Sequence, residues 1–150
     1  MGRNYLFIGF ILTILMSSCA SLNKSPSELV KTASTKESYC YSPDSKVIIK
    51  RIYDHLERCH TTFRQRPHFD GQTPQFGGQT QKMSLIQENI KGGSRLSLSN
   101  FFGTGYSVEI IKGSDSCNAE VNMYAVSFFW KSTFKLIDRA AKGEYIKCPG

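Results

Sequence analysis

The sequence predicts an α+β domain built from a helix, a four-stranded antiparallel meander and a second helix, with both helices on one face of the sheet. Three observations lead to this fold class. Two segments, one near each end of the domain, repeat apolar residues at helical spacing. Between them, shorter segments alternate apolar and polar residues with the period of a strand. Glycine-containing turns separate these shorter segments, so consecutive strands are expected to pair.

The first helix is predicted over residues 46–59, where one apolar stripe recurs every three or four positions: Ile48, Ile49, Ile52, Tyr53 and Leu56. The preceding Ser42-Pro43-Asp44 has the composition of a helix entry. Ser42 is expected to be the N-cap, Pro43 the first helical residue and Asp44 an acid in the first turn.

Four strands are predicted after this helix. The first covers residues 61–69, where Pro67 indicates a sheet edge. Residues 70–80, rich in Gly, Gln and Thr, are expected to form a long loop. The remaining strands and their irregularities follow in order: a strand at 82–90, a turn at Gly92-Gly93, a strand over 94–110 with a bulge or kink at 101–105, a turn at 112–115 and a strand at 117–125.

The second helix is predicted to begin after Ser127 as its cap and to end before Gly143. Its apolar positions again step by three or four residues: Trp130, Phe134, Ile137 and Ala141. The aromatic run that includes Phe128 and Phe129 is interpreted as core. Residues 144–147 are expected to form a short extended tail.

The N-terminus has the composition of an export signal. Arg3 is followed by about a dozen mostly apolar residues at 5–16, too few to span the ~30 Å hydrocarbon layer as a helix. Small residues then lead to Cys19. This ending resembles the lipobox of bacterial lipoproteins, with Met16 in the position where leucine is usual. The resemblance implies that Cys19 becomes the first residue and carries three acyl chains, which anchor a protein durably.

The same resemblance implies a location. Ala20 follows Cys19 without the acidic residue that retains many Gram-negative lipoproteins in the inner membrane, so the inner leaflet of the outer membrane is expected. We therefore expect a signal peptide at 1–18, a lipidated cysteine and flexible tether at 19–39, and one disulfide-stabilised domain at 40–150. Two alternatives stay open: secretion after cleavage behind Ala20, and an uncleaved signal anchor.

The chain is basic overall. The chain carries 19 Lys and Arg against 12 Asp and Glu, and loss of Arg3 with the signal leaves a formal charge of +6. Anionic lipid head groups, lipopolysaccharide phosphates and acidic proteins are partner classes that such a surface attracts. No nucleic-acid partner is expected.

Four cysteines remain once Cys19 is lipidated, and an even number in an exported chain favours disulfides. Of the three pairings, we predict Cys40–Cys117 and Cys59–Cys148. Cys40 and Cys59 stand at opposite ends of a helix about 20 Å long, too far for a bridge. The meander places the start of its last strand near Cys40, and the tail returns toward Cys59. None of the spacings is CxxC, so neither a zinc ribbon nor a redox dithiol is indicated.

Motifs for catalysis are weak. His60 follows Cys59, and His68 could approach it, but a Cys-His nucleophile or a metal site needs a free thiolate. Acidic residues are scattered, no G-x-S-x-G elbow occurs, and the glycines fit no phosphate loop. We expect no catalytic residue, no metal and no cofactor.

A basic group interleaved with aromatic residues is the candidate binding patch, because guanidinium groups bind phosphates and carboxylates. Its members are Arg58, Arg64, Arg66, Phe63 and Phe69. The chain also loosely resembles small disulfide-containing Gram-negative outer-membrane lipoproteins of unknown function, through its 52–59 helix end and its element order. We expect a non-catalytic envelope module that binds a protein or an anionic component through its sheet face or the 70–80 loop. The alternatives are a small envelope hydrolase and an inhibitor of a cell-wall hydrolase such as lysozyme.

Overall fold

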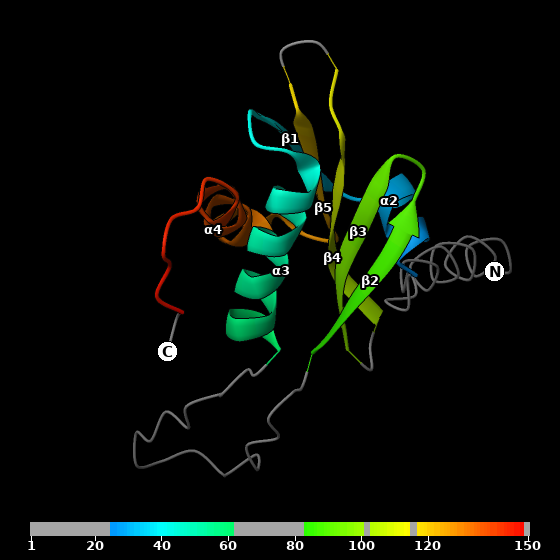
Figure 1. The fold of residues 1–150 in the computed structure, drawn as a ribbon. Helices are drawn as coiled ribbons and strands as arrows, with labels where there is room; N and C mark the ends of the chain where they lie inside the picture. Colours follow the sequence, from blue (N-terminus) through cyan, green and yellow to red (C-terminus); the bar gives the residue numbers. More distant parts are fainter. Residues whose placement is uncertain (1–24, 62–82, 101–102, 115–116, 149–150) are drawn as a thin grey trace, which may run out of the picture.

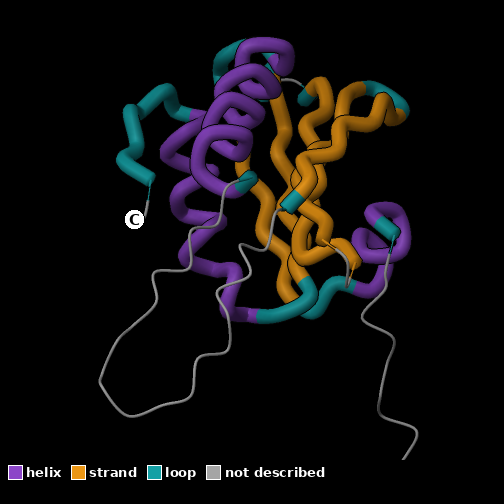
Figure 2. Tube along the Cα trace, turned by 90° about the horizontal axis from the view of Figure 1, so that it is seen from below, coloured by secondary structure: helices purple, strands orange, loops and turns teal. Residues whose placement is uncertain are grey.

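The computed structural model describes residues 25–61, 83–100, 103–114 and 117–148. These residues form an antiparallel sheet of five strands in the order β1-β5-β4-β3-β2. Helices α3 and α4 cover one face of the sheet, and the short helix α2 lies against the other (Figures 1 and 2). The class is α+β as predicted, but the described residues contain five strands and three α-helices rather than four and two. Across the same ranges, the longest apolar helical stretch falls short of what a membrane crossing requires.

Four consecutive strands form the predicted meander, each antiparallel to the next: β2 (Ser84–Ile90), β3 (Gly93–Asn100), β4 (Gly103–Lys112) and β5 (Ala119–Ala125). One prediction is wrong here, because residues 94–110 are two strands joined by a reversal and not one kinked strand. Ser97 lies opposite Ser107 across that hairpin. Gly103 begins β4 with a φ of 118°, a backbone conformation that favours glycine.

The turn between β2 and β3 falls where the glycine pair predicts it. Lys91 and Gly92 connect the two strands, and Gly92 has a φ of 82°. Gly93 is already paired in β3, where an added Cβ would lie 1.9 Å from the carbonyl oxygen of Ile110. The predicted strand at 61–69 and loop at 70–80 lie outside the described residues, apart from Thr61 at the end of α3.

The prediction of a tether over 19–39 is wrong for its described part. Residues 26–41 form α2 (Pro26–Thr32) and β1 (Thr35–Tyr41), and β1 pairs along its whole length with β5. Ser25 caps α2 by accepting a hydrogen bond from the backbone N–H of Glu28 at 3.3 Å. Leu29 is fully buried against the sheet. The polar composition misled the prediction because β1 is an edge strand that buries only alternate residues.

The two predicted helices are present and share one face of the sheet. α3 spans Ser45–His60, and its N-cap is Asp44 rather than Ser42: the Asp44 carboxylate accepts from the N–H of Lys46 at 2.8 Å. α4 spans Lys131–Ala141 and follows a 3-10 turn, η2 (Phe128–Trp130), that Ser127 caps. Gly143 ends α4 with a φ of 87°.

The main core lies between the sheet and the helices α3 and α4. Its largest members include Ile52, Leu56, Leu98, Tyr106, Met123 and Phe134. Phe134 is buried as predicted, but Phe128 and Phe129 are 64% and 76% exposed, so their assignment to the core is wrong. They begin η2, and only its last residue, Trp130, packs against the core.

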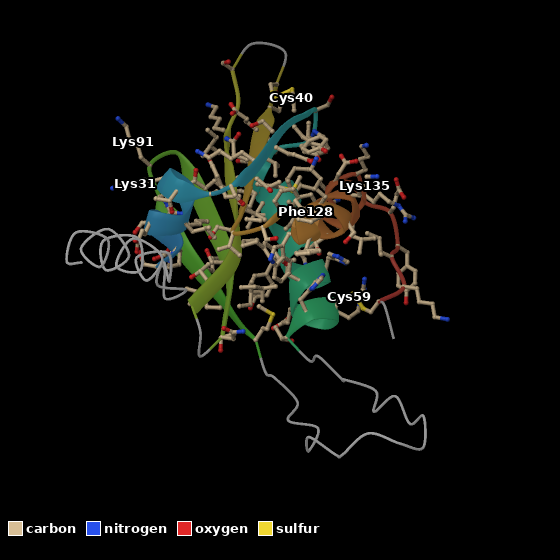
Figure 3. The ribbon with its side chains drawn as sticks, turned by 180° about the vertical axis from the view of Figure 1, so that it is seen from behind. Lys31, Cys40, Cys59, Lys91, Phe128 and Lys135 are labelled. Carbon is tan, nitrogen blue, oxygen red and sulfur yellow. A yellow bond between two sulfur atoms is a disulfide. The ribbon has the colours of Figure 1, made fainter. Side chains whose placement is uncertain are left out.

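Both disulfides are the predicted pairs, Cys40–Cys117 and Cys59–Cys148, with Cα atoms 5.5 Å and 5.0 Å apart. The pairing of β1 with β5 supplies the first, because Cys40 lies opposite Glu120 just after Cys117. The second joins the last turn of α3 to the C-terminal segment. Figure 3 shows Cys40 and Cys59 at opposite ends of the molecule.

Candidate functional site

Of the candidate binding patch, only Arg58 lies in the described residues; Arg64, Arg66, Phe63 and Phe69 lie outside them. The Arg58 guanidinium donates to the carbonyl oxygen of Ile146 at 3.2 Å and lies 5.1 Å from the centroid of the Tyr145 ring. Arg58 therefore holds the C-terminal segment against α3.

A shallow groove of about 280 Å³ runs between α3 and that segment. Arg51 lines it and donates to the carbonyl oxygen of Ala141 at 3.0 Å, in the last turn of α4. A cation in this position compensates the partial negative charge of a helix C-terminus. Asp54 and Glu144 also line the groove, so its charges are mixed. Because its two guanidinium groups bind backbone carbonyls, we assign the groove a structural role.

Two buried histidines lie behind the groove. The rings of His55 and His60 are 5.6 Å apart edge to face, and His60 lies 6.2 Å from the ring of Tyr106. In the part of the chain that the structure describes, neither ring nitrogen of His55, nor Nε2 of His60, nor the Tyr106 hydroxyl has a hydrogen-bond partner. His68 lies outside that part.

Burial shifts the pKa values of the side chains in this cluster. It lowers the pKa of His55 to about 4, an effect that His60 and Arg58 reinforce, and it also lowers the pKa of His60. Burial raises the pKa of Tyr106 well above its usual range. Cys59 is bonded to Cys148, so it offers His60 no thiolate. Among the described residues, no group of three or more His, Cys, Asp and Glu converges as metal ligands would.

The face of the sheet that carries α2 presents a hydrogen-bonded polar network, which we call the outer polar face. Its members are Glu88, Arg95, Glu109, Glu120, Asn122 and Tyr124. At its centre, Arg95 donates to Glu109 at 2.7 Å and to Glu88 at 3.2 Å, so one guanidinium links three neighbouring strands. Tyr124 donates to Glu109 at 3.2 Å from the next strand.

A second hydrogen-bonded set of the same face lies nearer the edge of the sheet. Asn122 donates to Glu120 at 2.9 Å and accepts from Ser38 of β1 at 2.5 Å. Lys36 lies 5.9 Å from the centroid of the Tyr124 ring. Burial, followed by the charge and hydrogen bond of Glu109, raises the pKa of Tyr124 to about 12, so its hydroxyl stays a donor at neutral pH.

α2 covers only part of this face. It packs on β4 and β5. Ser107 of β4 and Ser97 of the neighbouring β3 are buried on this face and share a hydrogen bond of 2.8 Å. Beyond it, the outer polar face is partly exposed, and Ile86 beside Glu88 exposes 38% of its surface. The face thus combines fixed polar groups with one accessible apolar side chain.

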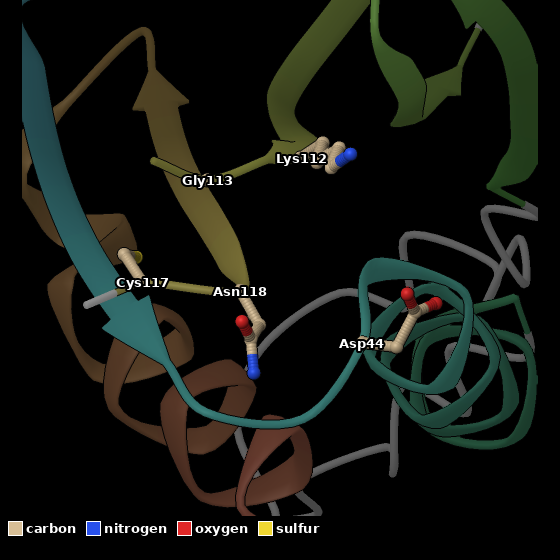
Figure 4. A pocket seen from close by; sticks show the side chains of 5 residues that line it. All are labelled: Asp44, Lys112, Gly113, Cys117 and Asn118. Atoms are coloured by element: carbon tan, nitrogen blue, oxygen red, sulfur yellow. The ribbon is translucent and has the colours of Figure 1, made fainter. Parts of the chain in front are cut away.

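A separate pocket of about 440 Å³ lies beside the Cys40–Cys117 disulfide (Figure 4). Asp44 and Lys112 approach it from different elements, and Asn118 donates to the carbonyl oxygen of Ser42. That contact ties the start of β5 to the loop before α3. Residues 115 and 116, next to this pocket, lie outside the described residues, so we assign it no function.

Sequence reasoning missed the outer polar face. The signal was present, since Glu88, Arg95 and Glu109 each occupy the polar parity of an alternating segment. Their proximity depends on strand register and on the hairpin between β3 and β4, and neither was predicted.

Comparison of the chain with protein-family models, with curated proteins and with solved structures gives no match. Function is therefore argued from the residues and their geometry alone.

Proposed function

We propose that the protein is a lipoprotein of the outer membrane, anchored through Cys19, whose periplasmic domain is a non-catalytic module that binds an envelope protein. The observation that carries the binding role is the outer polar face, a preordered and partly exposed network on the face of the sheet that the short helix α2 covers. The two disulfides support an oxidising compartment such as the periplasm.

The geometry of the network favours recognition over proton transfer. Glu88 and Glu109 both bind the guanidinium of Arg95, and Glu109 also accepts from Tyr124. Charge-assisted bonds of this kind hold side chains in one arrangement, which reduces the entropy lost when a partner binds. The exposed edge of Glu88 and the neighbouring Ile86 would provide the contact.

Anchoring is tested with Cys19→Ser. We expect the native protein to carry an acylated N-terminus at Cys19 and to fractionate with outer membranes, and the variant to lose the acyl mass and leave that fraction. Ser18→Ala, which keeps a small residue before Cys19, is the matched control and should remain acylated. Intact-mass analysis decides the outcome: an unmodified N-terminus at Ser21 would establish plain secretion instead.

Partner binding is tested with a photo-crosslinking residue at Ile86, compared with the same residue at Lys50 on α3. We expect one protein adduct in intact cells from position 86 only. Reversing the charge with Glu88→Lys should reduce the adduct about tenfold, because a misplaced charge in an interface costs more than 1.4 kcal/mol.

Glu57→Lys is the control for that substitution, since it makes the same charge change at an exposed position of α3. Equal loss in both variants, or no adduct from position 86, would argue against the outer polar face as the binding surface. Capture of a cell-wall hydrolase would favour the inhibitor among the alternatives.

A further inference from the structure

Phe128 and Phe129 form an exposed aromatic pair, which we call the aromatic corner. Their ring centroids are 4.2 Å apart, and the two side chains are the most exposed phenylalanines of the described residues. Phenylalanine has no polar atom that would benefit from contact with water, so two adjacent exposed rings indicate a surface that is covered in use. In Figure 3, Phe128 lies between α2 and α4.

The base of the corner is rigid. Ser127 caps η2 by accepting from the N–H of Phe129 at 3.4 Å. On the other side, the ring of Trp130 lies 4.9 Å from that of Tyr106 and packs so closely on Gly105 that an added Cβ would lie 2.9 Å from it. The two phenylalanines are thus held outward on a fixed turn. The turn therefore loses little conformational entropy when another surface covers the two rings.

Lysines accompany the aromatic pair. Lys131 and Lys135 are exposed one turn apart on α4, directly after the corner, and Lys31 is exposed in the last turn of α2. None of the three forms an ion pair with another described residue. Lysines whose charge is not compensated, beside exposed aromatic rings, match the chemistry of an anionic lipid surface.

Hydrogen bonds attach the segment before the aromatic corner to the connection between α2 and β1. Ser34, between α2 and β1, donates through its hydroxyl to the carbonyl oxygen of Val126 at 2.8 Å and through its backbone N–H to that of Ala125 at 3.1 Å. α2 is only seven residues long, about 10 Å at 1.5 Å per residue. The first described residue, Ser25, therefore lies within about 20 Å of Val126, two residues before the aromatic corner.

The described part of the domain starts at Ser25, only a few residues after the predicted anchor. Six residue steps separate Cys19 from Ser25, and a chain of that length reaches at most ~20 Å. A twenty-residue tether, by comparison, would let the domain turn freely away from the membrane. An acylated Cys19 therefore keeps the start of α2 and the aromatic corner near the lipid surface.

We propose that the aromatic corner inserts into the interface of the membrane that holds the anchor, with Phe128 and Phe129 at the boundary between head groups and acyl chains and the three lysines on lipid phosphates. The anchor and the corner then act as two contacts, which fix the orientation of the domain. The restricted reach of the tether depends on the proposed acylation, whereas the aromatic and cationic surface does not.

The test uses the native acylated protein in vesicles of phosphatidylcholine and phosphatidylglycerol. A tryptophan introduced by Phe129→Trp should be quenched by bromine on the acyl chains about twice as strongly as one introduced by Val47→Trp, because interfacial side chains lie 5–10 Å deep. Val47 is an exposed apolar residue in the first turn of α3. The wild-type protein contains Trp130 as its one tryptophan, and its signal is subtracted as background.

The charge arm of the test uses Lys131→Glu with Lys135→Glu, which should reduce quenching at position 129 in anionic vesicles but not in neutral ones. Lys91→Glu with Lys112→Glu, at exposed positions elsewhere, is the control. Equal quenching at positions 129 and 47 would overturn the proposal. So would protection of position 129 that rises with protein density and accompanies crosslinked dimers, since a second copy would then cover the corner.

Failure of the anchor is recognised separately. Intact mass reports acylation before the vesicles are made, and an unacylated chain is tested for quenching by added anionic vesicles. If intact mass shows no acylation, the anchor is rejected. Quenching at position 129 of that unacylated chain would still support the lipid-binding surface, and an absence of quenching would reject the surface as well.

Discussion

Replacing Cys59 and Cys148 by alanine lowers the free energy of unfolding by about 2–5 kcal/mol. The bridge joins residues 89 positions apart, and a crosslink across a long segment removes many conformations from the unfolded chain. It also holds the C-terminal segment, where Ile146 is buried and its carbonyl oxygen accepts from Arg58. The change is measured as a lower midpoint of urea denaturation.

Two comparisons make that result specific. The variant should become sensitive to protease near Tyr145, which is exposed, while Arg58→Lys should retain the disulfide and most of the stability. Reduction should destabilise the wild type more than the variant, because the variant keeps only Cys40–Cys117 to lose. An unchanged midpoint would mean that packing alone holds the C-terminal segment.

Acid should unfold the domain through its buried histidines. The folded-state pKa of His55 lies at about 4 against an ordinary 6.5, so the unfolded chain binds a proton between these values that the folded chain refuses. Stability is therefore highest above pH 6.5 and falls by about 3 kcal/mol as the pH drops to 4, at 1.36 kcal/mol per pKa unit. His60 acts in the same direction.

His55→Leu tests this directly. It removes two ring nitrogens that have no partner among the described residues, so stability at pH 7 should be equal or higher. The decline in unfolding free energy between pH 7 and pH 4 should become shallower in chemical denaturation. Lys50→Gln, on the exposed side of the same helix, should keep the wild-type slope. A His55→Leu slope as steep as that of the wild type would assign acid sensitivity to other groups.

Strong periodicity made some elements predictable. The stripe of Ile48, Ile52 and Leu56 gives α3, and the alternation from Ala119 to Ala125 gives β5, because each buries one full face. The disulfides followed from element order and the reach of the chain. These features depend on local residue patterns or on the reach of a chain segment, and both can be worked out from a sequence.

Other elements carried little local signal. β1 is a seven-residue edge strand with three exposed or half-buried polar residues, and α2 buries only Leu29. The apolarity of Phe128 and Phe129 suggests core, but the 3-10 turn that they begin holds both rings outside it. The outer polar face required register, and a shift of one residue would have moved Arg95 to the opposite face. Of the candidate binding patch, the one described member, Arg58, supports the C-terminal segment.

The two disulfides overlap along the chain, since one joins residues 40 and 117 and the other joins residues 59 and 148. A single peptide-bond cleavage anywhere between Cys40 and Cys148 therefore leaves both fragments covalently linked. In the periplasm that we propose as its location, a nicked copy would therefore stay in one piece. Only reduction, or a second cut, would release a fragment.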